Sequence, residues 1–265
     1  NDYELPCTFI FSNRISFKVD SQMLAKRKSQ TVTAAQFKSL TDAIENGNIK
    51  QVTSLVSICP ELIYFRNNSK MSALDYLCYT RPRPRYQLFT IRLGGHINAQ
   101  YWKTMSEIAG ILLDYGSEIN AQDRNRTPLQ TLLEKEDTND KDKAVPAELV
   151  QLLIDRGADL NVGQVQGNTD GTILHQAVEI IQMYKSDRLV PIVKILLENG
   201  ADVFATSDRE SQPVYDKIDS IKKNGFTKLA EMISKSGEEK SQILKPKVLL
   251  GAEEFLSSVR YAGEK

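Results

Sequence analysis

The chain has 265 residues, 41% of them hydrophobic, which is enough to bury the core of one large or two small domains. Lys plus Arg and Asp plus Glu number 34 each, so no net positive charge attracts nucleic acid, and we expect no such partner. No apolar stretch approaches the roughly 20 residues that cross a bilayer, so we expect no membrane insertion. Cys7, Cys59 and Cys78 lack paired spacing, which favours a reducing, cytoplasmic compartment.

The N-terminal segment, residues 1–36, predicts a short β-hairpin. Apolar and polar residues alternate from Phe9 to Val19 on either side of Ser12-Asn13, a pattern typical of two antiparallel strands joined by a tight turn. An isolated hairpin is barely stable in water. We therefore expect it to pack as a cap on the residues that follow.

Three later segments share one ending, residues 111–120, 152–161 and 195–204. In each, an apolar run is followed by a glycine where a helix must stop and the backbone must turn left-handed. These glycines are Gly116, Gly157 and Gly200. A second signature follows each ending, in which Thr or Pro starts a new helix. Its three copies are Thr127-Pro128-Leu129, Thr172-Ile173-Leu174-His175 and Gln212-Pro213-Val214.

Two earlier segments carry weaker copies of this unit. Residues 40–52 predict a first helix, a turn at Gly47 and a second helix, without the preceding turn. Residues 67–78 contain a degraded opening in which Ser72 and Asp75 stand at the positions of Thr172 and His175.

The repeated unit, with its Thr-Pro-Leu-His opening and its Leu-Leu-x-x-Gly-Ala-Asp-Val-Asn closing, resembles the ankyrin repeat. The resemblance covers about Phe37 to Ser234. It implies an all-α ankyrin-repeat solenoid of about five helix-turn-helix repeats, preceded by the hairpin. The repeats fall at about 37–66, 67–122, 123–162, 163–206 and 207–235. Residues 236–265 would form a C-terminal helical cap, with apolar residues at helical spacing from Val248 to Val259, or a detached tail.

The three middle units exceed the family period of about 33 residues. We place the extra residues between the two helices of a unit, at Thr80 to about His96, Glu136 to about Val145, and Ile181 to about Leu189. Loops there lengthen a repeat without interrupting the helix stack.

The residue types that carry chemistry do not assemble into a recognisable catalytic, cofactor-binding or metal-binding pattern. Only His96 and His175 offer an imidazole base, and the resemblance implies that His175 hydrogen-bonds between neighbouring turns. Gly94-Gly95 lacks the Lys and Ser or Thr of a phosphate-binding loop. The carboxylates from Glu134 to Asp142 alternate with lysines, which favours a solvated loop over a calcium site.

The resemblance implies a protein partner bound in a concave groove formed by turn tips and first helices. Carried over by position, the groove candidates are Asp42, Lys70, Met71, Tyr76, Arg124, Arg126, Thr131, Asn168, Asp170, Gln176, Arg209, Glu210 and Asp216. Arg81, Arg83 and Arg85 alternate with prolines in the first insertion, which indicates either a stiff basic docking strip or a solvated loop. We expect the chain to be monomeric.

Divergent repeats with long insertions resemble the ankyrin effectors that intracellular bacteria secrete, which would place the chain in host cytosol. The leading hypothesis is a non-catalytic protein-interaction module. A second is the targeting domain of a larger enzyme whose catalytic part lies on a flank. A third is a catalytic pocket that the hairpin and the C-terminal segment build against the repeats.

Overall fold

The computed structural model describes residues 32–80, 97–122, 126–134, 145–162, 171–206 and 212–241. The chain divides into two units, Asn1–Thr31 and Val32–Lys265, and all of the described residues belong to the second. The predicted hairpin and the predicted helix near residues 248–259 therefore lie outside the described residues. Every regular element within them is a helix, which agrees with the expected all-α class.

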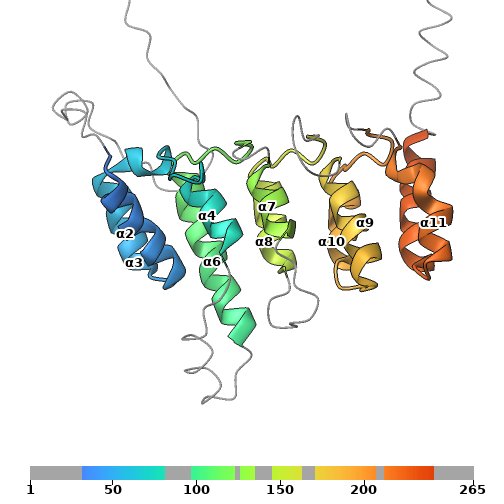
Figure 1. The fold of residues 1–265 in the computed structure, drawn as a ribbon, viewed down its shortest axis with the longest axis horizontal. Coiled ribbons are helices and arrows are strands. Elements are labelled where there is room, and N and C mark those ends of the chain that lie inside the picture. Colours follow the sequence, from blue (N-terminus) through green and yellow to red (C-terminus); the bar gives the residue numbers. More distant parts are fainter. Residues whose placement is uncertain are drawn as a thin grey trace, which may run out of the picture. The chain divides into compact units, whose positions relative to one another are not determined.

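The helices follow one another in the order shown in Figure 1. They are α2 (Ala34–Glu45), α3 (Ile49–Ile58), the 3-10 helix η1 (Pro60–Ile63), α4 (Ala73–Tyr79), α6 (Ile97–Asp114), α7 (Pro128–Glu134), α8 (Ala147–Asp155), α9 (Ile173–Tyr184), α10 (Val190–Glu198), the 3-10 helix η4 (Val214–Lys217) and α11 (Ile218–Lys223). A further helix covers residues 227–241.

These helices form two parallel series of contacts. We number the successive pairs as units: α2–α3 is unit 1, α4–α6 unit 2, α7–α8 unit 3 and α9–α10 unit 4, while η4 with α11 and the helix at 227–241 form unit 5. The first helices contact each other in the order α2, α4, α7, α9, η4, and the second helices in the order α3, α6, α8, α10. Each unit thus packs on the next in sequence order (Figure 1).

Four of the first helices begin with the same hydrogen-bonded box. The backbone N–H of the residue before the helix donates to a side chain three residues later. The pairs are Thr33 with Gln36, Ser72 with Asp75, Thr127 with Gln130 and Thr172 with His175. Such a cap satisfies N–H groups that the helix leaves unpaired and contributes about 1 kcal/mol. Asp75 therefore does locally what His175 does, although its chemistry differs.

The glycines at the helix ends have the backbone conformation that the sequence predicts. Gly116, Gly157 and Gly200 have φ of 94°, 93° and 95°, where a Cβ would be strained. In each, the glycine N–H and the next N–H donate back to the final turn, as in Ala201 N to Leu196 O at 2.9 Å. Gly225 in unit 5 forms the same turn with a φ of 93° and was not predicted as a helix end.

The core lies between the helices and is continuous from unit 1 to unit 5. The leucine of the repeated opening is buried in each middle unit, as Leu74, Leu129 and Leu174. The leucine of the repeated ending is buried likewise, as Leu112, Leu153 and Leu196. Burying such a side chain contributes about 2 kcal/mol, so this periodic apolar series supplies most of the stability of the stack.

Two boundaries differ from the sequence prediction. The helix α9 continues to Tyr184, so the connection to α10 is shorter than the insertion predicted at Ile181–Leu189. It continues because Ile181 keeps the apolar spacing of the helix and is buried. The helix at 227–241 also runs through the boundary placed between residues 235 and 236; Ile233 and Gly237 are both buried, and Gly237 lies against Tyr215 of η4 and Phe204.

Candidate partner-binding surface

Asparagines at the end of one unit hold the turn of the next. Asn120 accepts from Asp159 N at 2.8 Å and donates to Gly157 O at 3.0 Å. One unit later, Asn161 accepts from Asp202 N at 2.7 Å and donates to Gly200 O at 3.5 Å. The turns between units are therefore held at a fixed spacing, and that spacing positions the surface they form.

The side chain inside the box also binds the backbone of a turn between units. Gln130 accepts from Thr127 N at 2.9 Å and donates to Val162 O at 3.4 Å. In unit 4, His175 Nδ1 accepts from Thr172 N at 3.2 Å, so its Nε2 carries the hydrogen and donates to Gln212 O at 3.0 Å. The predicted structural role of His175 between neighbouring turns is confirmed.

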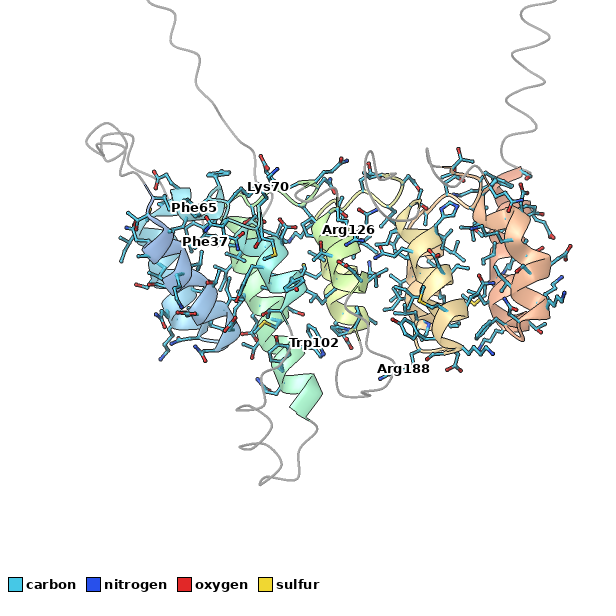
Figure 2. The ribbon with its side chains drawn as sticks, in the orientation of Figure 1. Phe37, Phe65, Lys70, Trp102, Arg126 and Arg188 are labelled. Carbon is cyan, nitrogen blue, oxygen red and sulfur yellow. The ribbon has the colours of Figure 1, made fainter. Side chains whose placement is uncertain are left out.

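Lys70 lies at the tip of a tightly bonded turn before α4. Asn67 Oδ1 accepts from the N–H groups of Ser69 and Met71, at 2.9 Å each, and Lys70 N donates to Asn67 O at 2.8 Å. Lys70 has a positive φ of 57° and is exposed. Figure 2 shows it at the edge where the first helices begin, with Arg126 near the same edge.

Two further candidates already have partners within the chain. The half-buried Tyr76 donates its hydroxyl hydrogen to Glu45 and so joins α4 to α2. Arg126 Nη1 lies 2.7 Å from Glu134 Oε2, with 20% of its side chain exposed. Both remain accessible at one face, but a partner would have to compete with these bonds for their polar atoms.

Met71, Thr131 and Gln176, which we expected on the groove surface, are buried with exposures of 7%, 8% and 8%. Gln176 Nε2 donates to Gln130 O at 3.1 Å, which links α9 to α7. Thr131 and Gln176 lie on α7 and α9, which contact the first helices on both sides, and Met71 lies in the turn before α4. This corrects the expectation that they form an exposed contact surface.

Two of the remaining candidates lie within the described residues, and eight lie outside them. Asp42 and Asp216 are exposed, on α2 and η4. The other candidates lie outside the described residues; they are Arg81, Arg83, Arg85, Arg124, Asn168, Asp170, Arg209 and Glu210.

The described residues offer little for covalent or metal chemistry. Burial raises the pKa of the Cys59 thiol, and its hydrogen bond to Glu61 raises it further, so the thiol is not activated as a nucleophile. No group of three or more His, Cys, Asp or Glu residues that could hold a metal ion occurs in the part of the chain that the structure describes. Over the same residues, no helix is both long and apolar enough to cross a membrane.

Residues 170–208 match the family model described as Ankyrin repeat. This segment contains the Thr172–His175 box, both helices of unit 4 and the glycine turn at Gly200, so unit 4 is similar to an ankyrin repeat in sequence and in structure. No curated protein matches the chain. The ankyrin-repeat resemblance inferred from the sequence motifs is thus supported by an independent match at unit 4.

Sequence reasoning missed Lys240. Its Nζ donates to Ala201 O at 2.8 Å and lies 3.4 Å from both Gly200 O and Asp202 Oδ1. The terminal helix thereby binds the turn of unit 4 that Asn161 binds from the other side. Lys240 lies in the segment 236–265, which the sequence predicts as a C-terminal cap or tail. Nothing in its local sequence indicates a contact 39 residues away.

Proposed function

We propose that the chain is a non-catalytic protein-interaction module, an ankyrin-repeat solenoid of about five repeats that binds a partner protein. The observation that best supports this is the recurrence of the unit 4 architecture outside the matched segment. Units 2 and 3 share its box, its glycine turn and its contacts with both neighbours. A series of such units offers an extended surface whose side chains can vary without disturbing the core.

The partner would contact the face lined by the turns before the first helices and by the exposed ends of those helices. Lys70, Asp42 and Asp216, which we assign to this face by repeat position, are exposed, and Tyr76 and Arg126 are partly exposed. The side chains that cross between units hold the backbone beneath them. The face is therefore organised before binding, which reduces the entropy lost on association. The insertion with Arg81, Arg83 and Arg85 would add a second, partner-specific contact.

The proposals about oligomeric state, compartment and bacterial origin rest on the resemblance to ankyrin repeats and to ankyrin effectors. A monomer in the cytoplasm, acting on host proteins if the chain is a secreted bacterial effector, fits a module of this kind. The alternative proposal is a recruiting domain of a larger enzyme, which would use the same face. The full reading frame separates the two, because an adjoining catalytic domain would favour recruitment.

The test is affinity capture from eukaryotic cytosol with four forms of the protein. These are the wild type, a variant lacking residues 81–92, a face variant with Lys70→Glu and Asp216→Lys, and a control with Lys103→Glu and Glu107→Lys. The control residues are exposed in the middle of α6, a second helix. Each double variant conserves net charge, so a difference between them reports position rather than total charge.

We expect a saturable partner that the control retains. Loss in the face variant alone would place recognition on the first-helix face, whereas loss in the deletion alone would place it in the basic insertion. A partner that all four forms retain equally would contradict the proposals that recognition lies on the first-helix face or in the basic insertion.

A further inference from the structure

The helix α9 is longer than the first helices of the two units before it. It has 12 residues, as α2 of unit 1 does, whereas α4 and α7 have 7 each. The extra turn ends in two large side chains that point to solvent, since Met183 is 65% exposed and Tyr184 is 50% exposed. The helix then stops at Lys185, whose backbone is left-handed with a φ of 50°. Met183 and Tyr184 are thus two adjacent exposed side chains in the last turn of a helix with a defined C-cap.

The end of α9 lies level with the end of α11 in the next unit. The bond from His175 Nε2 to Gln212 O joins the starts of the two first helices. From there α9 extends about 18 Å, while the consecutive 4-residue η4 and 6-residue α11 extend about 17 Å. Tyr184 and Lys223 therefore end at the same edge. Figure 1 shows α9 and α11 in neighbouring units, and Figure 2 shows Arg188 at this edge.

This edge is basic. Lys185, Lys222, Lys223 and Lys228 are exposed there, and no ion pair joins any of them to a described residue. The acidic residues near them in the sequence are Asp187, Asp219 and Glu231, all of which are exposed. Lys222 and Lys223 are favourable at the C-terminus of α11 because of the helix dipole, which accounts for two of the lysines. The same effect favours Lys185 at the end of α9. It does not account for Lys228, nor for the exposed apolar pair Met183 and Tyr184.

We propose that these six residues, Met183, Tyr184, Lys185, Lys222, Lys223 and Lys228, form a docking edge for an acidic peptide segment of a partner protein. The segment would place an apolar side chain on Met183 and Tyr184 and its carboxylates on the lysines. Tyrosine supplies rigid contact area, methionine is flexible and adapts to the shape of a ligand, and the lysines favour an acidic ligand over a neutral one. This inference deepens the proposed function and rests on it, but it concerns a different surface from the first-helix face.

The test selects 12-residue peptides from a displayed library on the full chain, and measures the affinity of fluorescein-labelled winners. We expect winners rich in Asp and Glu with one aromatic or aliphatic residue. Their affinity should fall by about tenfold or more in Tyr184→Ala and in the pair Lys222→Glu, Lys223→Glu, and should weaken with added salt. The matched control is Ile58→Ala with Lys50→Glu, an exposed apolar residue and an exposed lysine on α3, which should leave affinity within about twofold.

Three outcomes would overturn the inference. Winners without acidic enrichment would exclude the proposed ligand. Acidic peptides whose affinity falls when Lys70 and Asp216 are substituted, but not when the edge residues are, would support the proposed function and refute the docking edge. Binding to vesicles containing phosphatidylserine that requires Tyr184 and the lysines, with no acidic peptide selected, would assign the edge to an anionic membrane surface instead. Circular dichroism of each variant verifies that loss of binding is not loss of folding.

Discussion

Single side chains in this protein often satisfy two neighbours at once, and the residue type matters less than its pattern of donors and acceptors. Gln130 and His175 share no chemical family, yet each accepts from the N–H of the N-cap residue and donates to a backbone carbonyl in a turn between units. The sequence predicted the role of His175 from its resemblance to a repeat opening. It could not predict that Gln130 performs the same role. A glutamine amide can donate to or accept from many groups, and only the three-dimensional structure shows which groups Gln130 binds.

This equivalence gives a prediction for His175. The variant His175→Gln keeps an acceptor for Thr172 N and a donor for Gln212 O, so we expect a change of less than about 1 kcal/mol in the free energy of unfolding. The variant His175→Ala leaves both backbone groups without this partner in a buried site and should cost about 2–3 kcal/mol. Urea unfolding at neutral pH measures both. Equal losses in the two variants would show that packing of the ring, rather than its bonds, sets the stability.

Lys185 gives a second prediction at the same scale. It occupies a left-handed position, with φ 50° and ψ 44°, where a side chain costs about 1 kcal/mol and glycine is favoured. We expect Lys185→Gly to raise the free energy of unfolding by about 0.5–1 kcal/mol, whereas Lys185→Ala, which loses the charge but keeps the Cβ, should not. Thermal and urea unfolding compare the two. A stabilisation by alanine as well would attribute the effect to charge.

At the scale of elements, the sequence predicted helix starts well and helix ends unevenly. The glycine ends of α6, α8 and α10 were predicted, because the Leu-Leu-x-x-Gly pattern recurs. The ends of α9 and of the helix at 227–241 were not. Each helix continues past the predicted position through a residue that tertiary contacts bury, Ile181 in one and Gly237 in the other. Local propensity does not report such contacts, and it gives a polar, glycine-containing segment little chance of being helical.

Gly237 provides the prediction at this scale. In an exposed helix, Gly→Ala stabilises by about 1 kcal/mol. Here a Cβ would overlap the ring of Tyr215 and would lie 3.3 Å from Phe204 Cζ. We therefore expect Gly237→Ala to destabilise by about 1–3 kcal/mol, and Tyr215→Leu to recover part of that loss in the double variant. Glu231→Ala, at an exposed position of the same helix, is the control. A stabilising Gly237→Ala would mean that the helix is not seated on Tyr215.

The whole molecule depends on bonds between units as well as within them. The side chains of Asn120, Asn161 and Lys240 join consecutive units through backbone groups of their turns. Arg156 also lies 2.7 Å from Asp114 and Asn199 3.4 Å from Gln151, although such exposed contacts contribute little. The sequence indicates the units but not these links, and half of the predicted contact residues lie outside the described residues.

Asn161 tests whether the links couple the units. We expect Asn161→Ala to lower the free energy of unfolding by about 1 kcal/mol and to reduce the steepness of the urea transition, because units 1–3 and units 4–5 then unfold less cooperatively. Asn161→Asp keeps the acceptor for Asp202 N and should fall between the wild type and the alanine variant. An unchanged slope would mean that the apolar contacts between units suffice for cooperativity.

The asparagine bridges also bear on how such a protein can lengthen by internal duplication. Each bridge has two halves: the asparagine at the end of one unit and the turn of the next unit that receives it. Among the described endings, unit 3 carries both halves, because its turn binds Asn120 and its own Asn161 binds the next turn. Unit 4 carries only the receiving half, since Phe204 stands where the asparagine would be. A tandem copy of unit 3 would insert with every bridge intact, whereas a copy of unit 4 would leave one unmade. Growth of the array by repeat duplication is therefore favoured in its middle and disfavoured toward its C-terminal end.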